Sequence, residues 1–300
     1  MRKNRKVNSV SYTSNVLLNM IYAVYSLVCV VPLILVFMVS ITEESSVYQN
    51  GYSLFPKAIS LNTYRFLFLN SDKIIKGYGV TIFATVIGTG LSLLVTSLLA
   101  YALSRKSFRY RQGLSLYVYF TMLFNGGLVP YYLVWTQIPA ISVRNSIWAF
   151  VLPGLISGFN ILLVRSYFNT NIPDSLIESA KIDGAGELRI FSFIVLPLAK
   201  PVLATIGLFS IMGYWNDFFR NMLFISDDKY MNLQYLLYQI QNNIQTINGN
   251  PELAAKLGGT LPSETTRMAM VIITIGPLIF AYPFLQKYFV KGLTIGAVKG

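Results

Sequence analysis

Residues 178–197 read ESAKIDGAGELRIFSFIVLP and form a polar interruption between two long apolar segments. Just before them, Pro173 and Asp174 suit the first turn of a helix, where a missing N–H group costs nothing and a carboxylate meets the positive end of the helix dipole. Residues 183–186 favour a bend, and residues 188–195 continue an apolar stripe at helical spacing. The stretch therefore predicts a short helix, a corner and a second short helix.

By its physical pattern, this segment fits two roles, an amphipathic connector on a membrane surface or a docking element for a partner. Its spacing favours docking, because it follows E-A-A, three residues, G, nine residues, I-x-L-P and resembles the cytoplasmic signature of permeases of binding-protein-dependent ABC importers. Ser179 departs from the usual alanine, but both residues are small. The resemblance implies an ATPase-coupling role for Glu178, Ser179, Ala180, Asp183, Gly184, Ala185, Ile194, Leu196 and Pro197.

The resemblance covers nearly the whole chain and is strongest to maltose-type carbohydrate permeases. FNGGLVPYYLV at 124–134 and the ending QKYFVKGLTIGAVKG at 286–300 resemble permeases for complex oligosaccharides. The resemblance implies an all-α membrane protein with six transmembrane helices of the type I ABC importer permease fold, and a cytoplasmic coupling helix between spans 4 and 5. It also implies a heterodimer with a second permease, two ATP-hydrolysing subunits, an extracytoplasmic solute-binding protein and an oligosaccharide substrate.

Composition independently indicates an integral membrane protein. The 300 residues are 54% hydrophobic and 12% charged, with a mean hydropathy of +0.54. The net charge of +12 is carried by short basic clusters between apolar runs, a pattern that does not indicate a nucleic-acid surface. The single Cys29 lies within an apolar run and predicts no disulfide.

Six apolar runs have about the 20 residues that a helix needs to cross a bilayer. They cover residues 17–41, 80–103, 114–134, 147–167, 201–219 and 268–285. The first run is too long for a signal peptide, so we expect an uncleaved span. The predicted organisation is an N-terminal segment of residues 1–16, a permease domain of residues 17–285 with the coupling motif at 173–197, and a tail of residues 286–300.

Charge asymmetry orients these spans in the cell membrane. The segments on one side hold fifteen of the 24 basic residues and four of the twelve acidic residues. By the positive-inside rule, that side is cytoplasmic, and it includes both termini and the 178–197 stretch. The long segments 42–77 and 224–266 are then external. Turns are expected in the second of them at Asn242, Asn243, Asn248, Asn250 and Pro251. By resemblance these segments meet the partner permease and the binding protein; the alternative is two solvated loops.

Polar and aromatic residues at the outer end of the fifth span predict a candidate sugar path. They are Tyr214, Trp215, Asn216 and Asp217, and Arg220 is placed to pair with Asp217 at i, i+3. Aromatic faces accept the apolar side of a pyranose, while amides and carboxylates bond hydroxyl groups. Interfacial anchoring with a local ion pair is the alternative interpretation.

The C-terminal tail is too apolar for a free solvated end. Its glycines, including Gly292, favour an extended insertion over a helix, and the resemblance implies that Gly292, Leu293 and Ile295 contact the ATPases. Anchoring of the last span at the lipid interface is the alternative.

Two function classes remain, an ABC importer permease and a stand-alone secondary carrier or channel. The chain has no histidine, which excludes a Ser-His-Asp triad and a histidine metal site, and no G-x-x-x-x-G-K-[ST] phosphate loop, which excludes the ATP-hydrolysing subunit. We therefore predict no catalytic residues, metal or cofactor. Only Asp217 brings a carboxylate close to a span, which argues against coupling to an ion gradient.

Overall fold

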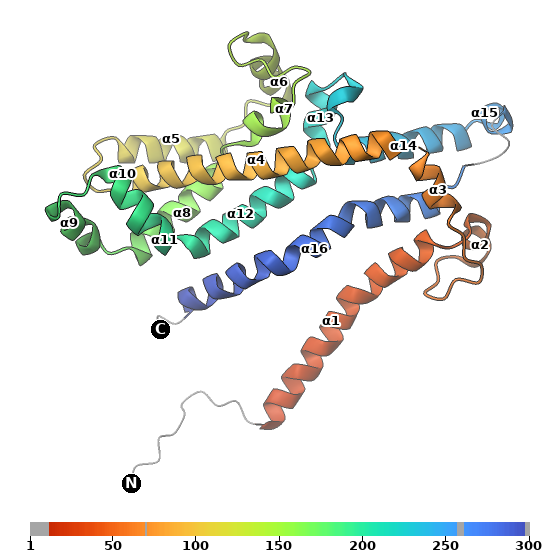
Figure 1. The fold of residues 1–300 in the computed structure, drawn as a ribbon, viewed down its shortest axis with the longest axis horizontal. Helices are drawn as coiled ribbons and strands as arrows, with labels where there is room; N and C mark the ends of the chain where they lie inside the picture. Colours follow the sequence, from red (N-terminus) through yellow and green to blue (C-terminus); the bar gives the residue numbers. More distant parts are fainter. Residues whose placement is uncertain (1–11, 70, 257–260, 298–300) are drawn as a thin grey trace. The chain divides into compact units, whose positions relative to one another are not determined.

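The computed structural model describes residues 12–69, 71–256 and 261–297, and these residues are mostly helical (Figure 1). Within these ranges, β-pairing is confined to one isolated antiparallel bridge between Thr42 and Ile59. The helical character expected from the sequence is confirmed. The chain divides into two compact units, residues 1–69 with 241–275 and residues 70–240 with 276–300.

The helices of the first unit are α1 (Tyr12–Ser40), α2 (Glu44–Asn50), α3 (Asn62–Phe68) and α15 (Pro251–Lys256). Those of the second unit are α4 (Ser71–Ser104), α5 (Arg111–Leu123), α6 (Leu128–Gln137), α7 (Trp148–Val151), η1 (Leu152–Gly154), α8 (Gly158–Asn171), α9 (Asp174–Ile182), α10 (Glu187–Ile190), η2 (Phe191–Val195), α11 (Leu196–Leu198), α12 (Lys200–Trp215), α13 (Phe219–Phe224) and η3 (Asp228–Tyr230). Residues of α14 (Leu233–Asn248) and α16 (Glu264–Ala297) belong in part to each unit.

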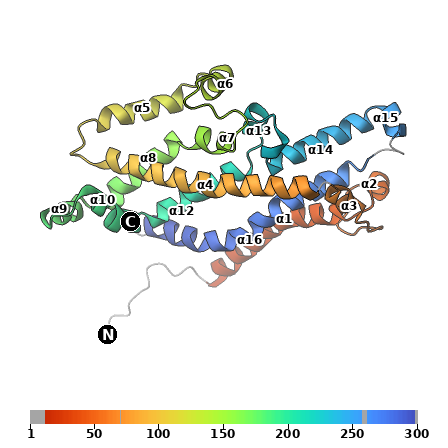
Figure 2. The same ribbon diagram turned by 45° about the horizontal axis from the view of Figure 1, so that its top comes forward.

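In the second unit, α4 packs lengthwise against α8 and α12, as both views show (Figures 1 and 2). Ala100 of α4, Val164 of α8 and Ile206 of α12 are almost fully buried in the core that these helices share. The same core extends to Ile177 of α9 and Phe191 of η2. The 178–197 stretch is therefore held against the ends of the long helices through apolar packing.

Two of the described helices, Tyr12–Ser40 and Asp72–Ser104, are long and apolar enough to cross a membrane alone. Two further pairs qualify if each bent pair counts as one span. They are Trp148–Gly154 with Gly158–Asn171, bent by 53°, and Glu187–Leu198 with Lys200–Trp215, bent by 80°. These four correspond to the first, second, fourth and fifth predicted spans. The sixth predicted run lies within α16.

The third predicted span, residues 114–134, is not one helix. It is broken after α5 and resumes at α6. At the break, Gly127 has a φ of +88°, and its amide donates to Asn125 Oδ1 at 2.8 Å. This side-chain bond competes with a helical bond, and the left-handed backbone suits glycine, so the sequence FNGG interrupts an otherwise apolar run.

The predicted turns in the long external segment are correct only in part. Asn242 and Asn243 lie inside α14, so their prediction as turn residues was wrong. Burial of the apolar face of α14, including Leu233 and Ile244, outweighs the weak helix propensity of asparagine. Asn250 does begin a new element, because its side-chain oxygen accepts from the amide of Glu252 at 3.0 Å at the start of α15.

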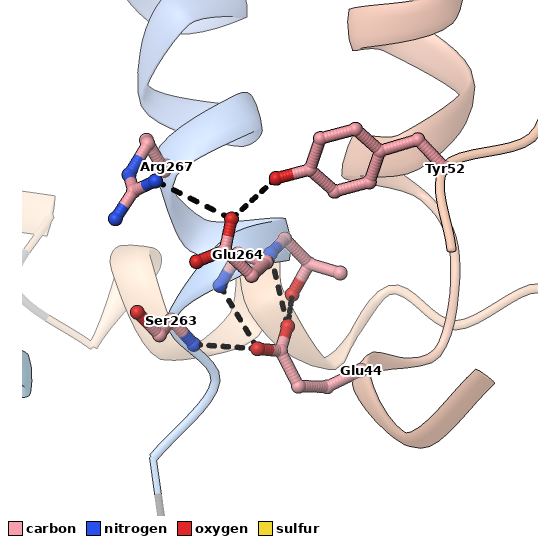
Figure 3. A network of polar contacts seen from close by, with 6 residues as sticks. Glu44, Tyr52, Ser263, Glu264 and Arg267 are labelled. Atoms are coloured by element: carbon pink, nitrogen blue, oxygen red, sulfur yellow. Dashed lines mark hydrogen bonds and ion pairs between the residues drawn. The ribbon is translucent and has the colours of Figure 1, made fainter. Parts of the chain in front are cut away.

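In the first unit, Glu44 of α2 caps the start of α16 (Figure 3). Its carboxylate accepts from the amides of Ser263 at 2.8 Å, Glu264 at 2.9 Å and Thr265 at 2.9 Å, and from the Thr265 hydroxyl at 2.5 Å. The first amides of a helix have no partner within it and carry a partial positive charge. Glu44 supplies the missing acceptor from a distant part of the sequence, and we call this arrangement the Glu44 cap.

Candidate functional site

The 178–197 stretch folds as predicted, with α9, a corner and α10. Helix α9 begins after Pro173 and ends at Ile182. Gly184 has a φ of +80°, its amide donates to Lys181 O at 3.0 Å, and the amide of Ala185 donates to Ala180 O at 2.9 Å. This pair of bonds is the Schellman ending of a helix, which places glycine in the left-handed position because a Cβ is strained there.

The two sides of this corner differ in character. Ile177 and Ala180 face the core, together with Ile190 and Phe191. The outer side exposes Glu178, Ser179 and Asp183 among large apolar side chains. Those apolar side chains are Ile182, Leu188 and Phe193, exposed by 86%, 75% and 77%. Exposed apolar surface of this kind marks either a protein–protein or a membrane interaction site.

Ion pairs fix the corner to neighbouring elements. Asp174, at the start of α9, lies 2.7 Å from Lys106 Nζ and 4.0 Å from Arg105 Nη1, both in the turn after α4. The hydrogen bond from Lys106 holds the pKa of Asp174 below its usual range. Across the corner, Lys181 pairs with Glu187 at 2.6 Å, and Glu187 also accepts from the hydroxyl of Tyr101 at 2.5 Å.

The remaining predicted coupling residues continue the chain into α12. Ala185, Ile194 and Leu196 are partly buried against the core, whereas Pro197 is exposed. Residues 191–195 form a π-helical segment, and the axis turns by 80° before α12 begins at Lys200. Pro197 and Pro201 each lack the amide that would continue a straight helix. The sequence did not predict the π-helical segment.

The predicted sugar-path residues lie in different surroundings in the structure. Tyr214 is buried and lines a cavity of about 290 Å³. Within the part of the chain that is described, Trp215, Asn216 and Asp217 are not part of its lining. Asp217 pairs with Arg220 at 3.0 Å, which confirms the i, i+3 pairing, and Arg220 itself lines the cavity.

Sequence reasoning missed most of the polar lining of this cavity. Ser92 comes from α4, Ser157 and Asn160 from the start of α8, and Ser210 from α12. One sequence signal was available, since α4 carries buried hydroxyl residues at positions 81, 85, 89, 92 and 96, along one face of an otherwise apolar helix. Polar residues inside a membrane span often mark a substrate pathway.

The tail differs from its predicted conformation. Helix α16 continues through Gly292, Leu293 and Ile295 to Ala297, so the extended form predicted for these residues was wrong. Residues 298–300, the side chains of 292–297, and the basic N-terminal residues 1–11 lie outside the described part of the chain. Once a long helix has formed, each added residue contributes one backbone hydrogen bond. This gain offsets the low helix propensity of glycine, which costs about 1 kcal/mol per residue.

Comparisons with known proteins agree that the chain is similar to transport permeases. A family model described as "binding-protein-dependent transport system inner membrane component" matches residues 4–295. The polygalacturonan/rhamnogalacturonan transport system permease protein YtcP of Bacillus subtilis (strain 168) is 40% identical over 276 residues, which cover 92% of this chain and 94% of the relative. The arabinooligosaccharides transport system permease protein AraQ of Halalkalibacterium halodurans is 26% identical over 95% of this chain and 96% of the relative.

A solved structure also resembles the chain closely. The crystal structure of a bacterial ABC transporter involved in the import of the acidic polysaccharide alginate contains a chain that is 31% identical. The two folds superimpose with a TM-score of 0.77, over 94% of this chain and 100% of that chain. The likeness therefore extends to the fold.

Proposed function

Because this chain belongs to the binding-protein-dependent transport system inner membrane components, we propose that it is the permease subunit that moves an oligosaccharide through the membrane in an ABC importer. The match to that family over residues 4–295 carries this function. Its relatives are named as sugar permeases, which supports a saccharide as cargo. The alternative of a stand-alone carrier or channel receives no support from these relatives.

The corner formed by α9 and α10 is the coupling element in this proposal. Its Schellman ending and its buried face give it a defined shape, while Glu178 and the apolar side chains Ile182 and Leu188 remain exposed. Such a surface fits a cleft on an ATPase that offers a basic side chain to Glu178. Closure of the ATPase pair would then move the ends of α8 and α12, which share a core with α9.

Six spans with both termini in the cytoplasm complete the topology in this proposal. The break between α5 and α6 makes the third crossing discontinuous, a form that membrane proteins tolerate where the backbone is covered by protein. Helix α1 exposes large apolar side chains such as Leu17, Tyr25 and Leu27 along its length, which suits contact with lipid. The protein is then a multi-pass component of the cell membrane.

The proposed assembly contains a second, homologous permease, two ATP-hydrolysing subunits and an extracytoplasmic solute-binding protein. ATP hydrolysis takes place in the partners, because this chain has no phosphate-binding loop. The helical end of α16, with Gly292, Leu293 and Ile295, is proposed to contact the ATPases. The sugar path passes Tyr214 and its cavity, and the exposed Asn216 together with Trp215 and Asp217 lies close in sequence to that path.

Reconstitution tests this function. The complete importer in proteoliposomes is expected to accumulate a labelled oligosaccharide only with ATP inside and binding protein outside. The chain alone is expected neither to hydrolyse ATP nor to accumulate sugar along a proton or sodium gradient. Gradient-driven uptake by the chain alone would overturn the proposal.

A further inference from the structure

The cavity beside Tyr214 has the chemical character of a saccharide site. Its volume of about 290 Å³ is at the small end of ligand pockets, enough for part of a chain but not for a long one. Three polar residues, Ser92, Asn160 and Ser210, line it together with two aromatic ones, Phe159 and Phe209. Hydroxyls and amides bond sugar hydroxyl groups, and aromatic rings accept the apolar face of a sugar ring.

One cation, Arg220, forms part of the cavity wall, and the described lining contains no carboxylate. The guanidinium is held in place by several partners: Nη1 donates to Phe150 O at 3.1 Å and to Asp217 Oδ2 at 3.0 Å, and Tyr131 also hydrogen-bonds to the side chain. Nη2 lies against Gly154, which also lines the cavity, and a Cβ at Gly154 would collide with the guanidinium. The absence of a side chain at position 154 therefore leaves space for this cation.

Tyr214 is positioned in a similar way. Its ring lies so close to Gly88 of α4 that a Cβ at that position would be 2.6 Å from the ring. Its hydroxyl donates to Val151 O at 3.3 Å, and Arg220 Cζ lies 5.6 Å from the ring centre. Two glycines on different elements thus allow an aromatic ring and a guanidinium to lie side by side at the cavity.

On the strength of the proposed function, we propose that this cavity binds a sugar unit that bears a carboxylate, and that Arg220 is the group that recognises it. A guanidinium has five N–H donors, so the bonds to Phe150, Asp217 and Tyr131 still leave donors for a second carboxylate. Asp217 lowers the cost of keeping the cation inside a membrane protein and orients it. A purely structural ion pair would make no distinction between acidic and neutral sugars, and this difference can be measured.

The test compares two sugars of equal length in the reconstituted importer, trigalacturonate and its carboxyl-reduced, neutral trimer. We expect Arg220→Gln to lower the ratio of acidic to neutral uptake about tenfold, the effect of losing a charge-assisted hydrogen bond. Arg220→Lys is expected to keep the charge but lose the two-pronged geometry, and to lower the ratio by a smaller factor. Arg144→Gln, the same change at an exposed residue outside the cavity, is the matched control.

A further variant separates recognition from folding. Arg220→Gln leaves Asp217 buried and unpaired, whereas the double variant Asp217→Asn with Arg220→Gln removes both charges. The double variant is expected to fold and still to show the lower ratio. An unchanged ratio in that variant, or a ratio that Arg144→Gln lowers equally, overturns the carboxylate site. Failure of the wild-type importer to take up either sugar with ATP would instead count against the proposed function.

Discussion

The corner at α9 and α10 and the Glu44 cap both join a helix end to a distant segment, but they use different interactions. At the corner, Asp174 pairs with the exposed Lys106. At the cap, Glu44 is partly buried and accepts hydrogen bonds from three backbone amides and one hydroxyl. Exposed ion pairs contribute little free energy, whereas charge-assisted bonds to helix amides contribute more.

The two kinds of interaction suit two different roles. The corner holds its shape through the glycine turn and a buried apolar face, and in the proposed function its exposed apolar and charged side chains bind the ATPase. The cap fixes α16 to the segment that follows α1, and its carboxylate is fully used inside the chain. Substitutions at the corner should therefore change coupling, and substitutions at the cap should change stability.

The largest effect is expected at Glu178. Glu178→Arg should prevent the proposed charge pair with the ATPase, and loss of one partner of a desolvated pair costs about 2 to 5 kcal/mol. ATPase binding to the solubilised chain should weaken by about 30-fold or more, with unchanged thermal stability. Glu252→Arg, which changes another exposed acid in a short helix, is the control. Normal uptake by Glu178→Arg would contradict the docking role.

The Glu44 cap gives the next largest effect, on stability. Glu44→Gln replaces a charged acceptor with a neutral amide, and the new NH2 group points at the backbone N–H donors of α16. We therefore expect a loss of about 2 kcal/mol in unfolding free energy. Thermal unfolding of the purified chain measures it. Glu43→Gln is the matched control, because Glu43 is exposed and its carboxylate accepts from the hydroxyl of the nearby Ser45 at 2.9 Å. Equal destabilisation by both changes would contradict the cap.

The cap also predicts a pH dependence. Burial raises the pKa of Glu44, but the hydrogen bonds from Thr265, Glu264 and Ser263 together lower it below its usual range. A lowered folded-state pKa means that the stabilisation is present above the usual value of about 4.3 and is lost as the pH falls through the lower folded-state value. The difference in stability between wild type and Glu44→Gln should therefore shrink below about pH 4. A difference that grows on acidification would contradict this sign.

Gly184 at the corner gives a smaller effect. Its φ of +80° strains any residue with a Cβ, so Gly184→Val should cost about 1 to 2 kcal/mol and weaken ATPase docking. Gly186→Val is a sharp control, because Gly186 has a φ of −71°, and a Cβ added at either glycine would have no heavy atom within 4 Å. Comparable losses in both variants would show that the glycine turn does not define the corner.

The sequence predicted the corner well because its determinants are local. Pro173, Asp174 and Gly184 each have a conformational preference that neighbouring residues do not override. The break at Gly127 was also visible in FNGG, but the flanking apolar residues made one continuous span the simpler prediction. The tail was predicted as extended because of its glycines alone. That prediction did not consider that the preceding helix, α16, continues into the tail.

The cavity and the Glu44 cap could not be predicted in the same way. Ser92 and Asn160 are 68 positions apart and meet because α4 packs against α8. Glu44 and Thr265 are 221 positions apart and are joined by the fold of the first unit. One sequence gives periodicity and turn preferences, but it does not state which helix faces pack together. Spacing did predict the pairing of Asp217 with Arg220, three residues apart.

The smallest effect is expected at Lys106, which forms the exposed ion pair that helps to hold the corner. The Lys106 side chain is 77% exposed, and its partner Asp174 also lies near the buried Arg105, which would remain in Lys106→Gln. We therefore expect a loss below about 1 kcal/mol, measured by thermal unfolding, that disappears near 1 M salt because the screening length falls to about 3 Å. Adding Asp174→Asn completes a double-mutant cycle that isolates the pair. A coupling energy of about 2 kcal/mol between Lys106 and Asp174 that persists in high salt would contradict this expectation. The ion pair would then hold the corner as firmly as Glu44 holds the start of α16.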